Sequence, residues 1–195
     1  MVYFQNMPFS DIYIAVFFIL SFLVLGAGVK YIDEAFDKET FSRKKALILA
    51  PFLGLLYAFL MSLHQTAATL LLAFLAGVFI SGKINNYAFY LQTLFFGVFV
   101  FLFDHIYILF FPFLILVGSS VIDEKGNDLS DKKKISNKHL DSWFRYRLTM
   151  DFVALLLALF GFIEIVFFIA FLSFDIGYTL VGEYSKKTAK NKSTF

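Results

Sequence analysis

The sequence contains no cysteine among its 195 residues. This absence excludes disulfide scaffolds, thiolate metal sites and cysteine nucleophiles, and it leaves the redox compartment undetermined. Charged residues are also scarce, at 16% of the chain, whereas 59% of the residues are hydrophobic and 29 are phenylalanine. A chain of this length with a mean hydropathy of +0.76 cannot hide its apolar surface in one water-soluble core, so we expect an integral membrane protein.

Familiar catalytic motifs are missing as well. The sequence has no Gly-x-Ser-x-Gly, no His-Glu-x-x-His and no phosphate-binding glycine loop. The beginning of the chain lacks the basic region of a signal peptide, and the apolar run that follows lacks a small-residue cleavage pattern, so we predict that this run is a retained membrane helix. We expect no nucleic-acid partner, because membrane topology accounts for the basic residues.

The apolar residues form continuous runs, which favours helices over a β-barrel. A membrane span needs roughly 17 to 25 apolar residues, and two longer runs are interrupted at Asp104-His105 and at 161–164. The sequence therefore predicts an all-α polytopic bundle of about seven short transmembrane helices in one domain. A polar cytoplasmic loop at 123–147 and a basic tail at 184–195 complete it. The predicted spans are 12–29, 46–63, 66–82, 87–103, 106–122, 148–163 and 166–183.

Lysine and arginine indicate the orientation of the chain. They occur only in the segments 30–45 and 125–147, at Lys83, and in the tail from 186 to 192. With seven spans, all these segments lie on one side of the membrane. Because basic residues concentrate in cytoplasmic loops, we predict an N-terminus outside and a C-terminus in the cytoplasm, with the plasma membrane as the location and membrane lipids as partners.

A short motif occurs twice in the chain. Gly28-Val-Lys-Tyr-Ile-Asp33-Glu34 and Gly118-Ser-Ser-Val-Ile-Asp123-Glu124 share Gly, Ile, Asp and Glu at identical spacing. Each copy lies where a predicted helix, the first and the fifth, reaches the cytoplasmic surface. This pattern suggests a parallel internal repeat about an axis near the membrane normal, a device that places binding sites at the repeat interface.

The two copies carry carboxylates in different ways. On a helix, Asp33 and Asp37 are neighbours on one face, whereas the Gly126-Asn127 pair predicts a turn, so that Asp123 and Asp128 would project from a loop. Magnesium is usually held by one or two carboxylates together with substrate phosphates. The sequence therefore predicts a Mg²⁺ site formed by these four aspartates.

Basic residues near both segments are candidates for neutralising the phosphates of a substrate. The alternative is that Lys30, Glu34 and Lys38 form ion pairs on a solvated helix end, and that the lysines serve only membrane topology. The sequence leaves both interpretations open. The candidate substrate-binding residues are Lys44, Lys45, Lys132, Lys133, Lys134, Arg145 and Arg147.

The two acidic segments, with four predicted helices between them, resemble the UbiA superfamily of intramembrane prenyltransferases. Members of that family have two Asp-rich cytoplasmic signatures that bind magnesium and a prenyl diphosphate. Asp33-Glu-Ala-Phe-Asp37 looks like the latter part of the first signature, with Val29 at the position of its Asn, and Asp123-Glu-Lys-Gly-Asn-Asp128 looks like the second. The resemblance implies a Mg²⁺-dependent enzyme acting at the cytoplasmic face on an isoprenoid or lipid diphosphate.

An alternative function comes from acidic residues at membrane depth. Asp175 lies near the middle of the last predicted span, where an ionised carboxylate costs at least ~2.5 kcal/mol, so such a residue normally faces a bundle interior or a watery cavity. Asp151 falls in the first turn of the preceding helix, where its charge complements the helix dipole. These two residues indicate a small proton- or cation-coupled transporter or channel as the alternative to an enzyme.

Overall fold

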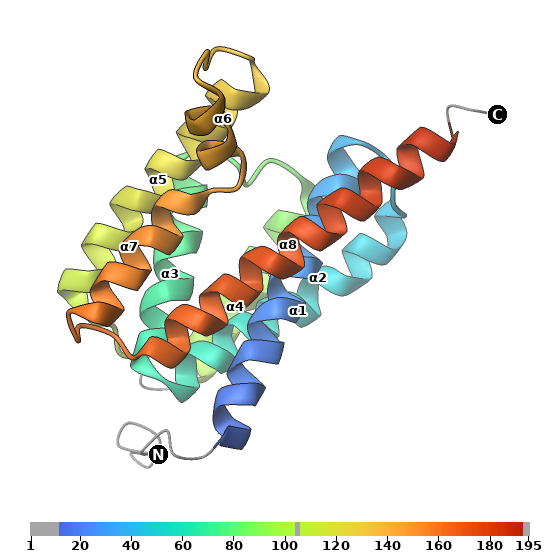
Figure 1. Ribbon diagram of the computed structural model, residues 1–195. Coiled ribbons are helices and arrows are strands. Elements are labelled where there is room, and N and C mark those ends of the chain that lie inside the picture. Colours follow the sequence, from blue (N-terminus) through green and yellow to red (C-terminus); the bar gives the residue numbers. More distant parts are fainter. Residues whose placement is uncertain (1–11, 104–105, 193–195) are drawn as a thin grey trace.

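The computed structural model describes residues 12–103 and 106–192, with side chains up to residue 189. The turn predicted at Asp104-His105 lies outside the described residues. Within them the chain is helical and has no strand, which confirms the all-α class (Figure 1). The described helices are α1 (Ile12–Asp37), α2 (Arg43–Leu63), α3 (Gln65–Ile80), α4 (Tyr87–Leu102), α5 (Phe110–Asp131), α6 (Lys138–Arg145), α7 (Leu148–Leu159) and α8 (Ile165–Lys192).

Three of these helices, α1, α2 and α8, are long and apolar enough to cross a membrane by length and composition. Helices α3, α4 and α7 are apolar but shorter, at 16, 16 and 12 residues. Each range predicted as a span overlaps one helix in position, and α6 is an additional short polar helix. This composition supports a membrane protein, and large apolar side chains on the outside of the bundle suit contact with lipid.

Several helices extend further than the sequence predicts. Helix α5 continues to Asp131, so the turn predicted at Gly126-Asn127 is wrong, and much of the predicted loop at 123–147 is helical. The reason is packing against Phe144 of α6. Gly126 is buried beneath that ring, and a Cβ at this position would lie 2.1 Å from a Phe144 ring carbon. The glycine therefore permits close packing here and does not mark a turn.

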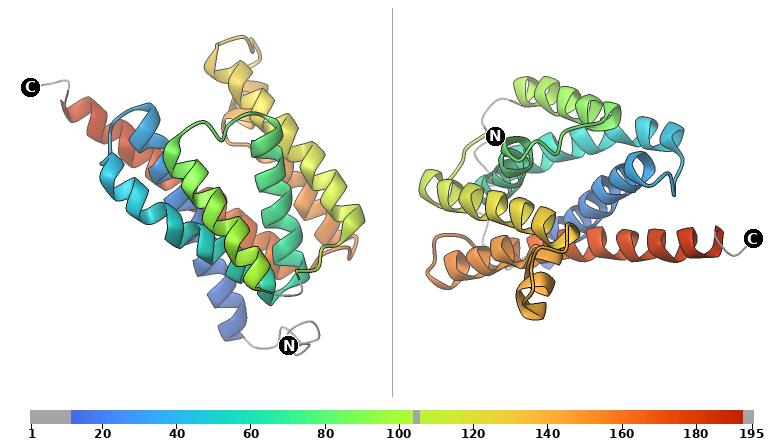
Figure 2. Two further views of the ribbon diagram at one scale, coloured as in Figure 1. Left: turned by 180° about the vertical axis from the view of Figure 1, so that it is seen from behind. Right: turned by 90° about the horizontal axis from the view of Figure 1, so that it is seen from above.

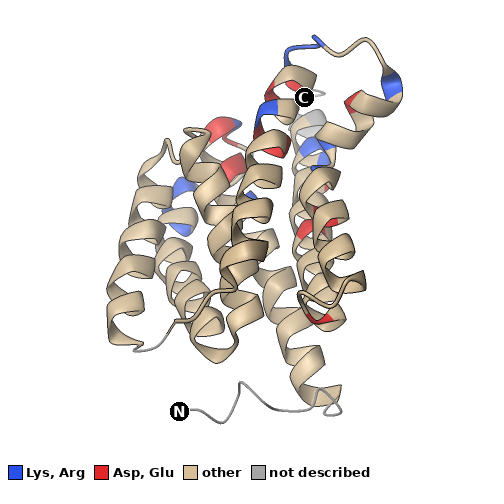
Figure 3. Ribbon diagram, turned by 90° about the vertical axis from the view of Figure 1, so that its left-hand side faces the viewer, with Lys and Arg blue, Asp and Glu red and all other residues tan. Residues whose placement is uncertain are grey.

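Six of the described helices pack in three pairs, α1 with α8, α2 with α4, and α3 with α5 (Figures 1 and 2). Helix α7 contacts both α5 and α8. Phenylalanine fills much of the interior, and Phe22, Phe167 and Phe171 are among its largest fully buried side chains. The basic residues gather toward the end of the bundle opposite the start of α1 (Figure 3).

Glycine allows the backbones within each pair to approach closely. A Cβ at Gly26 of α1 would lie 1.9 Å from the carbonyl oxygen of Phe174, and one at Gly177 of α8 would lie 2.2 Å from that of Leu23. Gly54 of α2 is in similar contact with the α4 backbone, and Gly77 of α3 lies against the side chain of Ser120 on α5. Small residues are the usual means of close helix contact in membranes. These contacts set the register that brings α1 and α8 side chains together at the charged end.

We predict that Gly26→Ala destabilises the protein by about 1 to 3 kcal/mol, because the added methyl must push the α1 and α8 backbones apart. Gly97→Ala is the matched control, since a Cβ built at this helical position would have no described atom within 4 Å apart from its chain neighbours and the nearby backbone of its own helix. The control should leave stability unchanged or raise it slightly. Thermal denaturation in detergent measures both variants, and an equal effect of the two would contradict the role assigned to Gly26.

Candidate functional site: a charged cavity at the basic end

A cavity of about 230 Å³ opens among the charged ends of the helices. Its lining comes from α1, α2, α3, α4, α5, α8 and the residues between them. The lining divides by chemistry into charged, neutral polar and apolar groups. The charged residues are Lys30, Asp33, Glu34, Asp37, Lys38, Lys83, Glu124, Asp131 and Arg147; the polar and aromatic ones include Asn85, Gln92, Thr93, Asn127 and Tyr178; the apolar ones are Val29, Phe74, Leu75, Val78, Ile84 and Phe89.

Glu34 anchors the α1 side of the cavity. Its side chain is only 1% exposed, and its Oε1 lies 3.0 Å from Lys30 Nζ and 2.9 Å from Lys38 Nζ. The Ser185 hydroxyl of α8 donates a 2.6 Å hydrogen bond to Oε2. Lys30 also pairs with Asp33 at 2.6 Å. A buried carboxylate is tolerated because these cationic and hydrogen-bonding partners offset its lost hydration.

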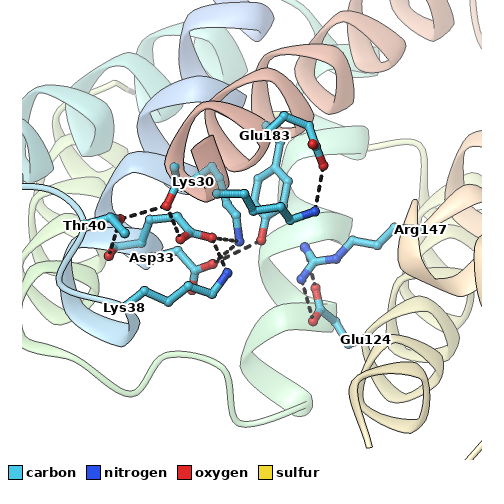
Figure 4. Close-up of polar contacts among 11 residues, drawn as sticks. Lys30, Asp33, Lys38, Thr40, Glu124, Arg147 and Glu183 are labelled. Atoms are coloured by element: carbon cyan, nitrogen blue, oxygen red, sulfur yellow. Dashed lines mark hydrogen bonds and ion pairs between the residues drawn. The ribbon is translucent and has the colours of Figure 1, made fainter. Parts of the chain in front are cut away.

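Glu124 and Arg147 form the corresponding pair on the other side of the cavity (Figure 4). Glu124 is 1% exposed, and its two carboxylate oxygens meet two guanidinium nitrogens at 3.0 and 3.2 Å. Burial acts to lower the pKa of Arg147, but nearby Tyr178, Glu124 and Asp33 outweigh burial and raise this pKa. The Arg147 backbone is left-handed, with φ of 55°, a conformation that is uncommon for residues other than glycine.

Tyr178 of α8 joins the two ion-pair groups. Its ring centroid lies 4.8 Å from Lys30 Nζ and 4.9 Å from Arg147 Cζ, distances typical of cation–π contacts. Its hydroxyl donates a 3.4 Å hydrogen bond to Asp33 Oδ2. Tyr178 could not be identified as a site residue from the sequence, because the two cations that it contacts are distant from it in the chain.

The aspartates of the duplicated motif differ in position. Asp33 lines the cavity, but the Asp123 carboxylate accepts hydrogen bonds of 3.0 and 2.7 Å from the backbone N–H groups of Thr149 and Met150. Asp123 thereby caps the start of α7, whose own N-cap residue makes no side-chain cap. Burial raises the pKa of Asp123, and the hydrogen bonds from residues 149 and 150 oppose that rise.

Of the four aspartates predicted as magnesium ligands, two line the main cavity and two do not. Asp33 and Asp37 line the cavity from successive turns of α1. Asp128 pairs with Lys83 and, like Asp123, does not line this cavity. Within residues 12–103 and 106–192, no group of three or more His, Asp or Glu is arranged to hold a metal.

The α5 side chains that do line the cavity are Glu124, Asn127 and Asp131. They are spaced i, i+3 and i+7, which is one face of a helix. This spacing would have identified them from the sequence, had the helix been predicted to continue through Gly126.

The candidate phosphate-binding residues also separate. The predicted lysines at 44, 45 and 132–134 are exposed and do not line the cavity, whereas Arg147 does. Arg145 lines a second cavity of about 160 Å³, which Arg147 also borders. The two arginines are therefore the members of the predicted set that face a cavity in the described part of the chain.

Two buried polar atoms at the main cavity have no hydrogen-bond partner among the residues that the structure describes. They are Nε of Arg147, a cationic donor, and Oε1 of Gln92, an acceptor on a side chain that is 7% exposed. Buried polar atoms are almost always paired in native proteins. An unpaired donor and an unpaired acceptor that border one cavity are the pattern expected where a bound molecule supplies the missing partners.

Asp151 and Asp175, the two acidic residues predicted at membrane depth, lie on α7 and α8. Helices α7 and α8 are in contact. Asp151 is 7% exposed, with an Oδ1 that no donor in the described chain satisfies, whereas Asp175 is half-buried. Asp123, Glu124, Arg147 and Asp175 line a small cavity.

No protein-family model, curated protein or solved structure matches this chain. The function is therefore inferred from the residues of the cavity and from their chemistry.

We predict that Asp123→Ala lowers the stability of the protein by about 1 to 2 kcal/mol, because the start of α7 loses the acceptor for two buried N–H groups. Asp128→Ala is the control. Its pair with Lys83 is partly exposed, with 39% of the Asp128 side chain accessible, so its loss should cost less. Thermal denaturation in detergent compares the two variants, and an equal loss would contradict the capping role of Asp123.

Proposed function

We propose that the protein is an integral membrane enzyme that acts, at its charged end, on an isoprenoid or other lipid diphosphate with Mg²⁺. The observation that carries this proposal is the composition of the 230 Å³ cavity. One part of its lining holds carboxylates and cations from α1, α5 and the residue before α7, and another part holds apolar side chains from α3 and α4. Such a lining suits a ligand with an anionic head and an apolar chain.

The volume supports a lipid bound by its head. Typical small-molecule sites measure roughly 300 to 1,000 Å³, so this cavity suits a diphosphate and the adjoining part of a chain. Phe74, Leu75 and Val78 of α3 and Phe89 of α4 offer the apolar surface. The rest of the lipid chain would then lie outside the cavity, along the apolar exterior of the bundle.

The charged lining supports a metal–diphosphate head. Five acidic and four cationic side chains border the cavity, so a bare diphosphate would meet carboxylates as well as cations. Mg²⁺ resolves this conflict, because it binds through one or two carboxylates together with substrate phosphates and water. We assign the metal to Asp33 and Asp37 on α1, with substrate phosphates and water as its other ligands, in place of a site shared with Asp123 and Asp128.

Arg147 is the residue proposed to contact the phosphate. Its Nε is buried without an acceptor, and a guanidinium forms planar, bidentate contacts with phosphate oxygens. Together with Mg²⁺ it would stabilise negative charge on a departing diphosphate. The likeness of the two acidic segments to the UbiA superfamily implies the same class of reaction. The seven-span topology, with the basic end in the cytoplasm and the plasma membrane as the location, belongs to this proposal.

We predict that the purified protein binds geranylgeranyl diphosphate in the presence of Mg²⁺ and loses most of this affinity in EDTA. In the Asp33→Asn, Asp37→Asn double variant, Mg²⁺-dependent affinity should fall by about tenfold or more, because the cation loses its α1 ligands. Isothermal titration calorimetry in detergent measures binding, and release of free diphosphate measures turnover.

The matched control for that experiment is Asp141→Asn. Asp141 is an acidic residue of α6 that pairs with Arg145 and does not line the main cavity. The loss of binding can be attributed to the site if this control binds like the wild type and if all variants have thermal midpoints near that of the wild type. Equal binding with Mg²⁺ and with EDTA, or full binding by the double variant, would refute the proposal.

A second candidate function, proton- or cation-coupled transport, is favoured by one observation. Asp151 is buried with an unsatisfied carboxylate oxygen, and Asp175 on the neighbouring helix is half-buried. The small cavity that Asp175 lines also borders Arg147, which lines the main cavity as well. Ionisable groups at membrane depth commonly mark proton and ion pathways. This arrangement would let a proton or small cation on these aspartates influence a ligand at Arg147.

For this second candidate we predict proton or cation flux in proteoliposomes that Asp175→Asn abolishes. The amide keeps the size of the carboxyl group and can still form hydrogen bonds, so the fold should survive, and a thermal midpoint verifies this. Asp141→Asn again serves as the control and should keep wild-type flux. Absence of flux in the wild type, or unchanged flux in Asp175→Asn, would exclude transport through these aspartates.

A further inference from the structure

The second cavity, of about 160 Å³, adjoins the first at the charged end. Seven residues line both, among them Lys30, Glu34, Arg147 and Tyr178. The two spaces therefore share a wall, made of the ion pairs and the aromatic ring already described. The residues that belong to the second cavity alone are Arg145, Tyr146, Thr179, Gly182, Glu183 and Lys186.

The two cavities differ in charge. Five cations and three acids line the second cavity, whereas four cations and five acids line the first. The cations of the second cavity are Lys30, Lys38, Arg145, Arg147 and Lys186, and its acids are Glu34, Asp131 and Glu183. The second space thus carries the excess positive charge that the first lacks, and an anion can bind there without a metal ion.

The two cavities also differ in polarity. The first is lined by aliphatic and phenylalanine side chains from α3 and α4, whereas the second has none of these and is lined by charged residues, tyrosine, threonine, asparagine and glycine. A lipid chain would find no apolar contact there. The expected ligand is therefore small and water-soluble.

The cations of the second cavity can turn toward a ligand at little cost. Arg145 pairs with Asp141 and Lys186 with Glu183, each with a neighbour on its own helix and each with more than half of the cationic side chain exposed. Exposed pairs of this kind contribute little to stability and rearrange readily. Arg147 also borders this space, and its guanidinium adds positive charge to the wall that the two cavities share.

From these observations we propose that the second cavity binds the phosphoryl group of a small water-soluble compound, the co-substrate of the lipid bound next to it. This assignment of a second substrate class rests on the proposed function, but the binding site itself does not. Arg145 and Lys186 contact the anion, Arg147 adds positive charge to the shared wall, and Tyr178 separates the anion from the lipid head. The protein thus holds a lipid diphosphate and a soluble phosphate compound on opposite sides of a shared wall.

The test uses inorganic pyrophosphate and the full-length protein in lipid-free detergent with EDTA, conditions that remove the metal on which the first cavity depends. Calorimetry should show saturable binding to the wild type. The double variant Arg145→Gln, Lys186→Gln should lower the affinity for pyrophosphate by about tenfold or more. The matched control, Lys132→Gln, Lys133→Gln, removes the same charge from exposed positions outside both cavities, and it should stay within about twofold of the wild type.

Asp37→Asn separates this proposal from the proposed function. Asp37 lines the first cavity alone, so pyrophosphate binding in EDTA should persist in this variant even if Mg²⁺-dependent lipid binding is lost. The second site would be overturned if the wild type showed no saturable binding in EDTA, or if the control double variant weakened binding as much as Arg145→Gln, Lys186→Gln does. Neither result would bear on the lipid site, which has its own test.

A final comparison tests whether the phosphoryl group comes from solution or from a membrane phospholipid. The wild type is placed in nanodiscs of phosphatidylcholine or of phosphatidylglycerol, and pyrophosphate binding is compared at high salt to suppress surface repulsion. Equal affinity in the two nanodiscs supports a soluble ligand. Competitive loss of binding in phosphatidylglycerol would overturn that assignment and identify a lipid headgroup as the occupant.

Discussion

The burial of two glutamates determines how the charged end of this protein is built. Glu34 and Glu124 are almost completely inaccessible, and a buried carboxylate without a cation would be strongly destabilising. Lys30 must therefore lie beside the first and Arg147 beside the second. Both cations require further partners, which Tyr178 of α8 provides. Electrostatic interactions thus hold together the charged ends of α1, α5 and α8, which lie beyond the phenylalanine-rich interior.

The same constraint accounts for the shape of the cavity. The charged side chains on each wall of the cavity pair with neighbours on the same wall. They therefore do not reach across to the opposite wall, and the space between the two walls stays open. Because cations and acids are nearly balanced around the main cavity, its selectivity depends on where each group lies and not on net charge. An amphipathic ligand with a metal-bound head fits such a balanced lining better than a simple anion or a simple cation would.

The sequence predicted much of the helical architecture, because the length of an apolar run is a direct measure of a membrane helix. It also placed Asp33 and Asp37 on one helix face. It misplaced the α5 residues, since Gly126-Asn127 is a turn signal locally and only the ring of Phe144 makes the glycine part of a helix interface. The position of Asp151 relative to Asp175 could not be read from the sequence, because it depends on how α7 and α8 face each other.

The glycine contacts have a mechanical consequence for the cavity. Each of the pairs α1–α8, α2–α4 and α3–α5 contains a contact too close for even a methyl group, so the two helices of a pair cannot slide past each other easily. All three pairs contribute residues to the main cavity. Any widening or narrowing of that space must then come from rigid-body shear between pairs. The cavity is the junction of three stiff units, and a ligand that fills it would brace all of them at once.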